Sequence, residues 1–206
     1  MTPILYSFRR CPYAMRARLA LLSANLSVEI REISLKNKPL ELKVISKKAT
    51  VPCLQTEKKI FPESLEIMYW VLGKSDQEQL LDISLKGIDL IKYNDGPFKT
   101  CLDRTKYHAN YDNVELAVEH KIAKEFLSQL NEELRTEFIL GEKRTLVDLA
   151  LLPFIRQYAF IDKRWFDAQN WSNLNRWLNS FLRSKSFAII QRKYPIWNPG
   201  DKPTIF

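Results

Sequence analysis

The sequence predicts an α/β domain followed by an all-helical domain, and two observations support this. In roughly the first third of the chain, short apolar stretches typical of strands alternate with segments of helical periodicity. Around Gly73-Lys74-Ser75-Asp76 the strand signals stop, and afterwards apolar residues recur at helical spacing. A chain of 206 residues can form two domains. We therefore expect one domain over residues 1–75 and a second over residues 80–206.

The first domain is expected to have the element order β-α-β-α-β-β-α. Its predicted strands cover residues 3–8, 27–35, 51–56 and 59–61, and its predicted helices cover residues 12–24, 39–48 and 64–72. Pro12 suits the first turn of its helix, where a missing N–H costs nothing. The first β-α-β would be a parallel crossover, and the last two strands would form a hairpin.

The second domain is expected to be entirely helical. Its predicted helices cover residues 77–93, 97–107, 114–134, 146–160 and 174–185. The spacing of Thr145 and Asp148, directly before an apolar run, is typical of a capping box at a helix start. The segment 196–206 is rich in proline and is expected to lie over the surface.

Composition argues against several classes of protein. No apolar run approaches the roughly 20 residues that cross a bilayer, and the first residues do not resemble a signal peptide. We therefore expect a cytoplasmic protein without a membrane partner. The chain has 3 cysteines and 2 histidines, without a CxxC or Cys/His cluster. This pattern predicts free thiols and no metal site, and it disfavours a histidine-based catalytic triad.

The positive charge is unevenly distributed. Residues 1–75 contain 13 Lys+Arg and 6 Asp+Glu, while the rest of the chain contains 19 and 18. A basic first domain suits an anionic ligand, although a solvated basic face would look the same. The sequence lacks interleaved aromatic and basic repeats, which disfavours nucleic acid as the partner.

Cys11 is the candidate for a reactive residue. It lies where the first predicted strand ends and the first helix begins, directly before Pro12. Unpaired N–H groups and the helix dipole at such a position favour the thiolate, which is the reactive form of cysteine. Arg9, Arg10 and Arg16 add positive potential nearby. The alternative is a buried, inert cysteine, as most free cysteines are.

The stretch from Phe8 to Arg18, FRRCPYAMRAR, resembles the active-site turn of cysteine-type glutathione transferases, particularly omega-like and related bacterial forms. It is also similar to glutaredoxins, many of which have a second cysteine where this chain has Ala14. The resemblance implies a thioredoxin-like first domain, glutathione as co-substrate and a monothiol mechanism at Cys11.

Three further segments resemble glutathione-binding parts of this family. Lys38 matches a lysine that binds a glutathione carboxylate in omega-type enzymes. Thr50-Val51-Pro52 is similar to the family's cis-proline loop, in which the backbone of Val51 would pair with the cysteinyl part of glutathione. Glu63 and Ser64 resemble the pair that binds the γ-glutamyl end. Each segment alone has a plain structural interpretation, but together and in this order they are fairly specific.

The resemblance implies a second substrate, either a small molecule or a disulfide, bound between the Cys11 turn and the helical domain. Candidate lining residues are aromatic side chains and one cation on the expected helices, namely Phe98, Tyr107, Arg156 and Tyr158. Each is individually more typical of core or surface. A homodimer is also expected.

Two alternatives to glutathione-dependent thiol transfer or reduction remain. One is conjugation of glutathione to an electrophile, for which Ser7 and Tyr13 are possible donors to the glutathione sulfur. The other is a non-catalytic scaffold of transferase fold that binds a protein, or nucleic acid through its basic first third. A scaffold has no need of the thiol at position 11.

Overall fold

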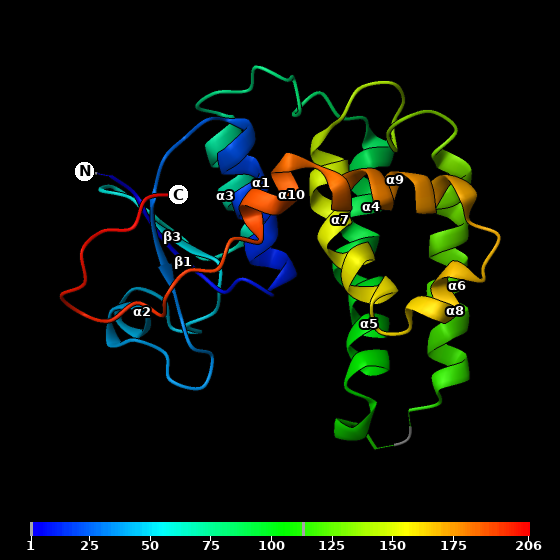
Figure 1. Cartoon of the computed structure of the whole chain (residues 1–206), viewed down its shortest axis with the longest axis horizontal. Helices are drawn as coiled ribbons and strands as arrows, with labels where there is room; N and C mark the ends of the chain where they lie inside the picture. The colour runs from blue at the N-terminus through cyan, green and yellow to red at the C-terminus, as the bar shows by residue number, and fades with distance from the viewer. Residues whose placement is uncertain (1, 113) are drawn as a thin grey trace. The chain divides into compact units, whose positions relative to one another are not determined.

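The structure of the protein is a computed structural model, and it describes residues 2–112 and 114–206 (Figure 1). The chain forms two compact units, one of Met1–Gln77 with Lys185–Phe206 and the other of Glu78–Ser184. The first contains a sheet with helices, and the second contains helices from α4 to α9. The predicted fold class, a thioredoxin-like α/β domain followed by a helical domain, is confirmed.

The sheet of the first unit has four strands in the order β2-β1-β3-β4. The strands are β1 (Ile4–Ser7), β2 (Glu29–Glu32), β3 (Cys53–Gln55) and β4 (Ile60–Phe61). β1 pairs with β2 in parallel, and β3 is antiparallel to both β1 and β4. The predicted parallel crossover and the predicted hairpin are therefore both confirmed.

Four helices belong to this unit: α1 (Pro12–Ser23), α2 (Leu40–Ile45), α3 (Ser64–Leu72) and α10 (Lys185–Ile190). Side chains alternate between the two faces of a strand, so Tyr6 and its partner Cys53 share one face. There they form a buried cluster with Leu42 of α2. α1 packs against both α3 and α10, and most of its residues are buried.

The segment that follows α10 pairs with the sheet, an association that the sequence did not predict. The backbone N–H of Phe206 donates to the carbonyl of Val28 at 2.9 Å, and that of Ile30 donates to the carbonyl of Thr204 at 2.8 Å. Nearer α10, the N–H of Trp197 donates to the carbonyl of Glu32 at 2.8 Å. Residues 204–206 therefore pair with the outer edge of β2, and Trp197 binds its end (red trace in Figure 1).

The second unit is built from helices with short connections. They are α4 (Leu85–Tyr93), a π-helical turn η1 (Asn94–Phe98), α5 (Lys99–Lys106), a 3₁₀ turn η2 (His108–Asn110), α6 (Leu116–Glu133), α7 (Leu146–Ala159), α8 (Lys163–Asp167) and α9 (Ser172–Arg183). Pro97 has no amide hydrogen, which suits the widened turn before α5.

The predicted helix over residues 77–93 is wrong in its first half. α4 begins only at Leu85, because Ser84 is its N-cap and accepts the N–H of Gly87 at 3.3 Å. Gln79 has φ 58°, a left-handed conformation that no α-helix contains. Leu80 is nevertheless buried, and its carbonyl accepts the N–H of Leu146 at 2.8 Å. The apolar side chain of Leu80 indicated a helix, but the residue lies in an irregular segment.

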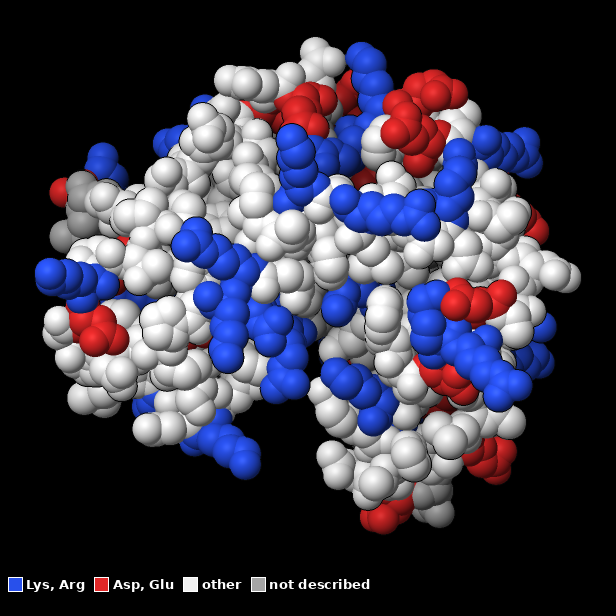
Figure 2. All heavy atoms as spheres, viewed as in Figure 1, with Lys and Arg blue, Asp and Glu red and all other residues white. Residues whose placement is uncertain are grey.

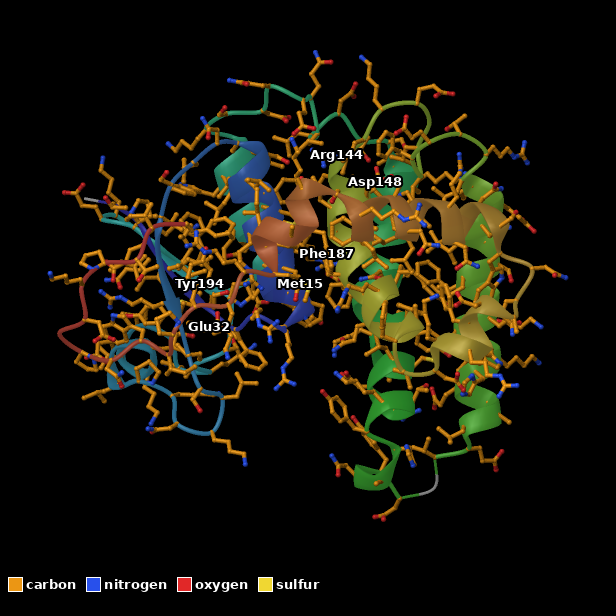
Figure 3. All side chains as sticks on the ribbon, in the orientation of Figure 1. Met15, Glu32, Arg144, Asp148, Phe187 and Tyr194 are labelled. Atoms are coloured by element: carbon orange, nitrogen blue, oxygen red, sulfur yellow. The ribbon has the colours of Figure 1, made fainter. Side chains whose placement is uncertain are left out.

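The predicted capping box at the start of α7 is confirmed. Asp148 accepts the N–H of Thr145 at 2.9 Å, the N–H of Ile139 at 3.1 Å and the indole N–H of Trp177 at 3.0 Å. Its side chain is fully buried, and this burial raises its pKa against the lowering effect of these hydrogen bonds. Asp148 therefore joins α7, α9 and the loop before α7 (labelled in Figure 3).

This arrangement predicts a large effect for Asp148→Ala. The substitution leaves three buried donors without an acceptor, and each such group costs about 1–3 kcal/mol. We expect the free energy of unfolding, measured in urea, to fall by at least about 3 kcal/mol. Asp148→Asn keeps one acceptor oxygen and should lose less.

Asp162→Ala is the matched control. Asp162 is an exposed N-cap whose carboxylate accepts the N–H of Trp165 at 2.8 Å. Its loss should cost about 0.5–2 kcal/mol. Equal losses for Asp148→Ala and Asp162→Ala would contradict the role of Asp148 as a junction between helices.

Candidate active site

The sheet topology brings four segments to one edge. β1 and β2 are parallel, so the chain leaves both strands at the same edge. β3 is antiparallel to β1 and therefore begins there, and β4 is antiparallel to β3 and therefore ends there. The segments at this edge are those of Cys11, Lys38, Val51-Pro52 and Glu63-Ser64. The four motifs separated in the sequence thus all emerge from one side of the sheet.

Cys11 occupies the N-cap position of α1. Its φ of −75° and ψ of 123° are extended, and its carbonyl accepts the N–H of Met15 at 3.0 Å. Its own N–H donates to the carbonyl of Phe8 at 3.0 Å, which closes the turn between β1 and α1. The thiol is therefore at the positive end of a helix of 12 residues, as the sequence predicted.

The thiol of Cys11 also lies close to the predicted proline loop. Its sulfur is 3.5 Å from the carbonyl oxygen of Val51, to which the thiol can donate. The peptide bond between Val51 and Pro52 is cis, as the sequence predicted. Pro52 is buried, whereas Val51 and Cys11 are partly exposed. One face of this pair is thus open to solvent.

The other predicted glutathione-binding residues have distinct settings. Glu63 is exposed at the N-cap of α3, and Ser64 is the buried first residue of that helix. Unpaired N–H groups at a helix start attract a carboxylate. Lys38 is partly exposed in the loop before α2. Its loop and the amino end of α3 follow strands that end at the same edge as β1.

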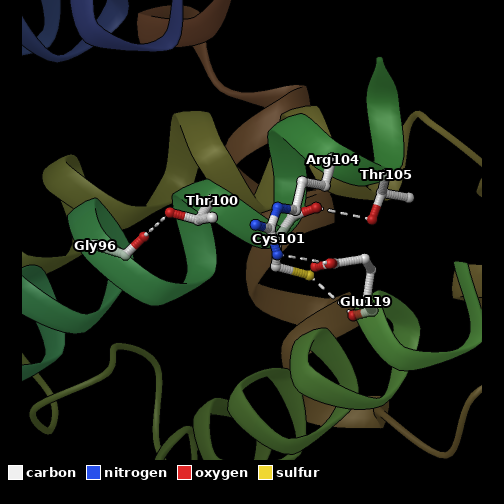
Figure 4. A network of polar contacts seen from close by, with 6 residues as sticks. All are labelled: Gly96, Thr100, Cys101, Arg104, Thr105 and Glu119. Carbon is white, nitrogen blue, oxygen red and sulfur yellow. Dashed lines mark hydrogen bonds and ion pairs between the residues drawn. The ribbon is translucent and has the colours of Figure 1, made fainter. Parts of the chain in front are cut away.

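Cys53 and Cys101 differ from Cys11 because both are fully buried. Burial raises the pKa of each thiol to about 11. Cys53 lies in the core of the sheet, and Cys101 lies on α5, where its thiol donates to the carbonyl of Glu119 at 2.9 Å (Figure 4). Arg104 forms an ion pair with the same Glu119 at 3.3 Å.

The residues predicted to line a second-substrate pocket all belong to the helical unit. Phe98 and Tyr158 are buried, with their ring centroids 5.5 Å apart, and Phe98 also packs on Phe126. Tyr107 is 46% exposed at the end of α5. Arg156 is partly exposed, and its guanidinium lies over the ring of Phe160.

The alternative hydroxyl donors are also placed. Ser7 is fully buried at the end of β1, which keeps its hydroxyl from bulk solvent. Tyr13 is partly exposed, and its ring centroid lies 5.6 Å from the guanidinium carbon of Arg16. Unlike Ser7, which is buried, Cys11 is partly exposed, and it also occupies the N-cap position of α1.

Sequence reasoning missed two buried charged residues beneath the Cys11 turn, Arg18 of α1 and Glu32 of β2. Arg18 is four residues after Ala14 and three before Leu21, so helical periodicity places it on a buried face. An arginine in that position is a signal for a buried polar contact. For Glu32 the strand alternation gave a similar signal.

Two absences apply to the described residues. Among them, no group of three or more His, Cys, Asp or Glu side chains is arranged to hold a metal ion. No helix within residues 2–112 and 114–206 is long and apolar enough to span a membrane. The net positive charge is visible on the face drawn in Figure 2, where blue side chains extend over both units.

Solved structures similar in fold include three from different kinds of organism. Glutathione transferase Omega 3C from Trametes versicolor has a TM-score of 0.78 and 19% identity, covering 93% of this chain and 84% of its own. A glutathione transferase family member from Pseudomonas fluorescens Pf-5, with two glutathione bound, has a TM-score of 0.78 and 21% identity over 92% of each chain. Poplar glutathione transferase F1 has a TM-score of 0.74 and 16% identity, covering 92% of this chain and 96% of its own.

No curated protein matches the sequence. Two family models do match it, and they describe successive domains of one family. Residues 5–79 match the N-terminal domain of glutathione S-transferases, which contains the Cys11 turn and the cis-proline loop. Residues 113–180 match the C-terminal domain of the same family. With both domains matched in order and the fold shared, the chain belongs to the glutathione S-transferase family.

Proposed function

We propose that this protein is a cysteine-type glutathione transferase that carries out glutathione-dependent thiol transfer or reduction, with Cys11 as nucleophile. The observation that supports this most directly is the position of Cys11. Cys11 is partly exposed at the amino end of α1, whereas the other two cysteines are buried. A thiolate at a helix start is stabilised by the N–H groups and the dipole.

The reaction would proceed in two displacements. The Cys11 thiolate attacks the glutathione sulfur of a mixed disulfide, forming a Cys11–glutathione disulfide and releasing the other thiolate, which takes up a proton. The thiolate of a second glutathione then attacks the sulfur of the bound glutathione. This step forms glutathione disulfide and returns Cys11 as a thiolate. Two electrons pass from glutathione to the substrate.

Glutathione would bind along the edge where the four segments meet. Its cysteinyl part would pair with the backbone of Val51, next to the cis-Pro52 and 3.5 Å from the sulfur of Cys11. Its γ-glutamyl end would meet Glu63 and the amino end of α3 at Ser64. Lys38 would bind a glutathione carboxylate. The bound glutathione of the Pseudomonas fluorescens structure supports this assignment by fold alone.

Several family expectations stay predictions. They are the division into domains 1–75 and 80–206, a homodimer, a cytoplasmic location, and a second-substrate pocket lined by Phe98, Tyr107, Arg156 and Tyr158. The buried setting of Phe98 and Tyr158 makes Tyr107 and Arg156 the pair to test first.

The first prediction concerns the identity of the nucleophile. Incubation with oxidised glutathione should attach one glutathione to Cys11, because Ala14 stands where a resolving cysteine would release the adduct. Mass spectrometry with peptide mapping should find the adduct on Cys11, and excess reduced glutathione should remove it. Cys11→Ser should lose both the adduct and thiol transfer. An adduct chiefly on another cysteine would overturn the proposal.

A second prediction concerns selectivity among the thiols. At pH 8, a thiol with a pKa of about 11 is ionised in roughly one molecule per thousand. Its thiolate fraction rises with pH, and buried groups are also hidden from reagents. In the folded protein, alkylation by iodoacetamide at pH 8 should therefore modify Cys11 and spare Cys53 and Cys101. Denatured protein is the control, in which all three should react alike.

The third prediction tests the glutathione-binding edge. Glu63→Ala removes an exposed carboxylate that would meet the γ-glutamyl amino group, so glutathione should bind more weakly. Alkylation of Cys11 should stay nearly unchanged. Glu66→Ala, which removes another exposed carboxylate of the same helix, is the matched control. Unchanged affinity in calorimetry would exclude Glu63 from the site.

A further inference from the structure

A pair of opposite charges is buried beneath the turn that contains Cys11. Arg18 of α1 is fully buried, and Glu32 at the end of β2 is 5% exposed. Taking an isolated charge out of water is costly, so buried charges need partners. Both side chains bind backbone groups of the short segment between β1 and α1, residues 8–11, which we call the Cys11 turn. Arg18 Nε also donates to the carbonyl of Ala14 within α1, at 3.3 Å.

Arg18 binds backbone carbonyl groups of the Cys11 turn. Its side chain points back toward the amino end of α1, as helical side chains do. Nη2 donates to the carbonyl of Arg9 at 2.8 Å and lies 3.5 Å from the carbonyl of Phe8. The same Phe8 carbonyl accepts the N–H of Cys11 at 3.0 Å. The guanidinium therefore contacts the group that holds the Cys11 backbone.

Glu32 binds a backbone N–H group of the same turn. Its Oε1 accepts the N–H of Arg9 at 2.5 Å. Arg9 thus has its N–H held by a carboxylate and its carbonyl held by a guanidinium. Trp197 in turn donates its N–H to the backbone carbonyl of Glu32, so the segment after α10 supports this strand end. Figure 3 labels Glu32 at the end of β2 and Tyr194 in the segment after α10.

The charge on Arg18 also acts on the thiol. Burial lowers the pKa of Arg18 to about 10, which leaves it a cation at neutral pH. The groups whose charges act on it are Glu32, Cys11 and Tyr194, which favour its charged form, and Arg9, which opposes it. Electrostatic interaction is mutual. A cation that a Cys11 thiolate stabilises therefore stabilises that thiolate in return.

We propose that Arg18 and Glu32 are positioning residues that set the reactivity of Cys11 in opposite directions. Arg18 holds the Cys11 turn and supplies a buried positive charge that favours the thiolate. Glu32 holds the same turn but supplies a negative charge that limits this effect. The inference rests on the proposed function, in which Cys11 is the nucleophile.

The test is the pH dependence of Cys11 alkylation by iodoacetamide, a reaction in which the thiolate displaces iodide. Arg18→Gln removes the positive charge and should raise the apparent pKa of Cys11 by about one unit. Glu32→Gln keeps an oxygen that can accept from Arg9 and removes the negative charge. It should lower the apparent pKa of Cys11 by a fraction of a unit. Arg18→Lys restores the charge and should bring the value back toward that of the wild type.

Arg176→Gln is the matched control. Arg176 also donates to backbone carbonyls, those of Leu134 at 3.0 Å and of Thr136, but it belongs to the helical unit. Its loss should leave the pKa of Cys11 unchanged. A thermal melt of each variant checks folding, and peptide mapping assigns the alkylated residue.

The opposed shifts separate a charge effect from a packing effect. Loosening the turn would move the pKa of Cys11 in one direction for both variants, and that result, or no shift in either, would overturn the inference. If Arg18→Gln does not fold, Glu32→Gln decides the matter: a pKa that falls supports the pair, and one that rises or stays overturns it. Absence of thiol transfer in the wild type, with the opposed shifts present, would refute the proposed function alone.

Discussion

The position of Cys11 depends on how the chain turns from β1 into α1. A single backbone bond, from the N–H of Cys11 to the carbonyl of Phe8, closes this turn, and Pro12 starts the helix directly afterwards. The buried face of α1 supplies a further constraint by packing against α3 and α10. The thiol is therefore held by a helix that has little freedom to move.

Burying the charges of Arg18 and Glu32 beneath this turn has a thermodynamic cost, since both side chains lose their contact with water. An apolar residue in place of Arg18 would pack in the same helix without a desolvation penalty. The polar pair instead fixes one conformation of a short turn, which has few side chains of its own to pack. Burial raises the pKa of Glu32 above its ordinary value, while Arg9 and Arg18 lower it. The backbone N–H of Arg9, which Glu32 binds, and the charge of Arg18 thus both favour the carboxylate form.

Much of the fold could be predicted from the sequence because it depends on local patterns. Strand alternation, helical periodicity and the Thr145–Asp148 spacing are properties of neighbouring residues, and the corresponding elements are present. The cis bond before Pro52 and the N-cap position of Cys11 follow from residue type and order. The failures involve contacts that are distant in sequence. Leu80 is buried in an irregular segment and its carbonyl binds the N–H of Leu146, and Phe206 pairs with Val28; no local pattern encodes either contact. The hydrogen bond between Glu32 and Arg9 also joins residues distant in sequence, and that of Arg18 to Arg9 joins a helix to the turn before it, so the sequence alone did not predict them.

The pairing of the final residues with β2 has a consequence for the order of events during synthesis. Residues 28–30 leave the ribosome long before their partners 204–206. Until then the outer edge of β2 exposes unpaired N–H and C=O groups, which can recruit other strands. Glu29 and Arg31 occupy this edge and form an ion pair at 2.6 Å. Charged side chains on an edge strand discourage such pairing, which protects the nascent sheet before residues 204–206 are made.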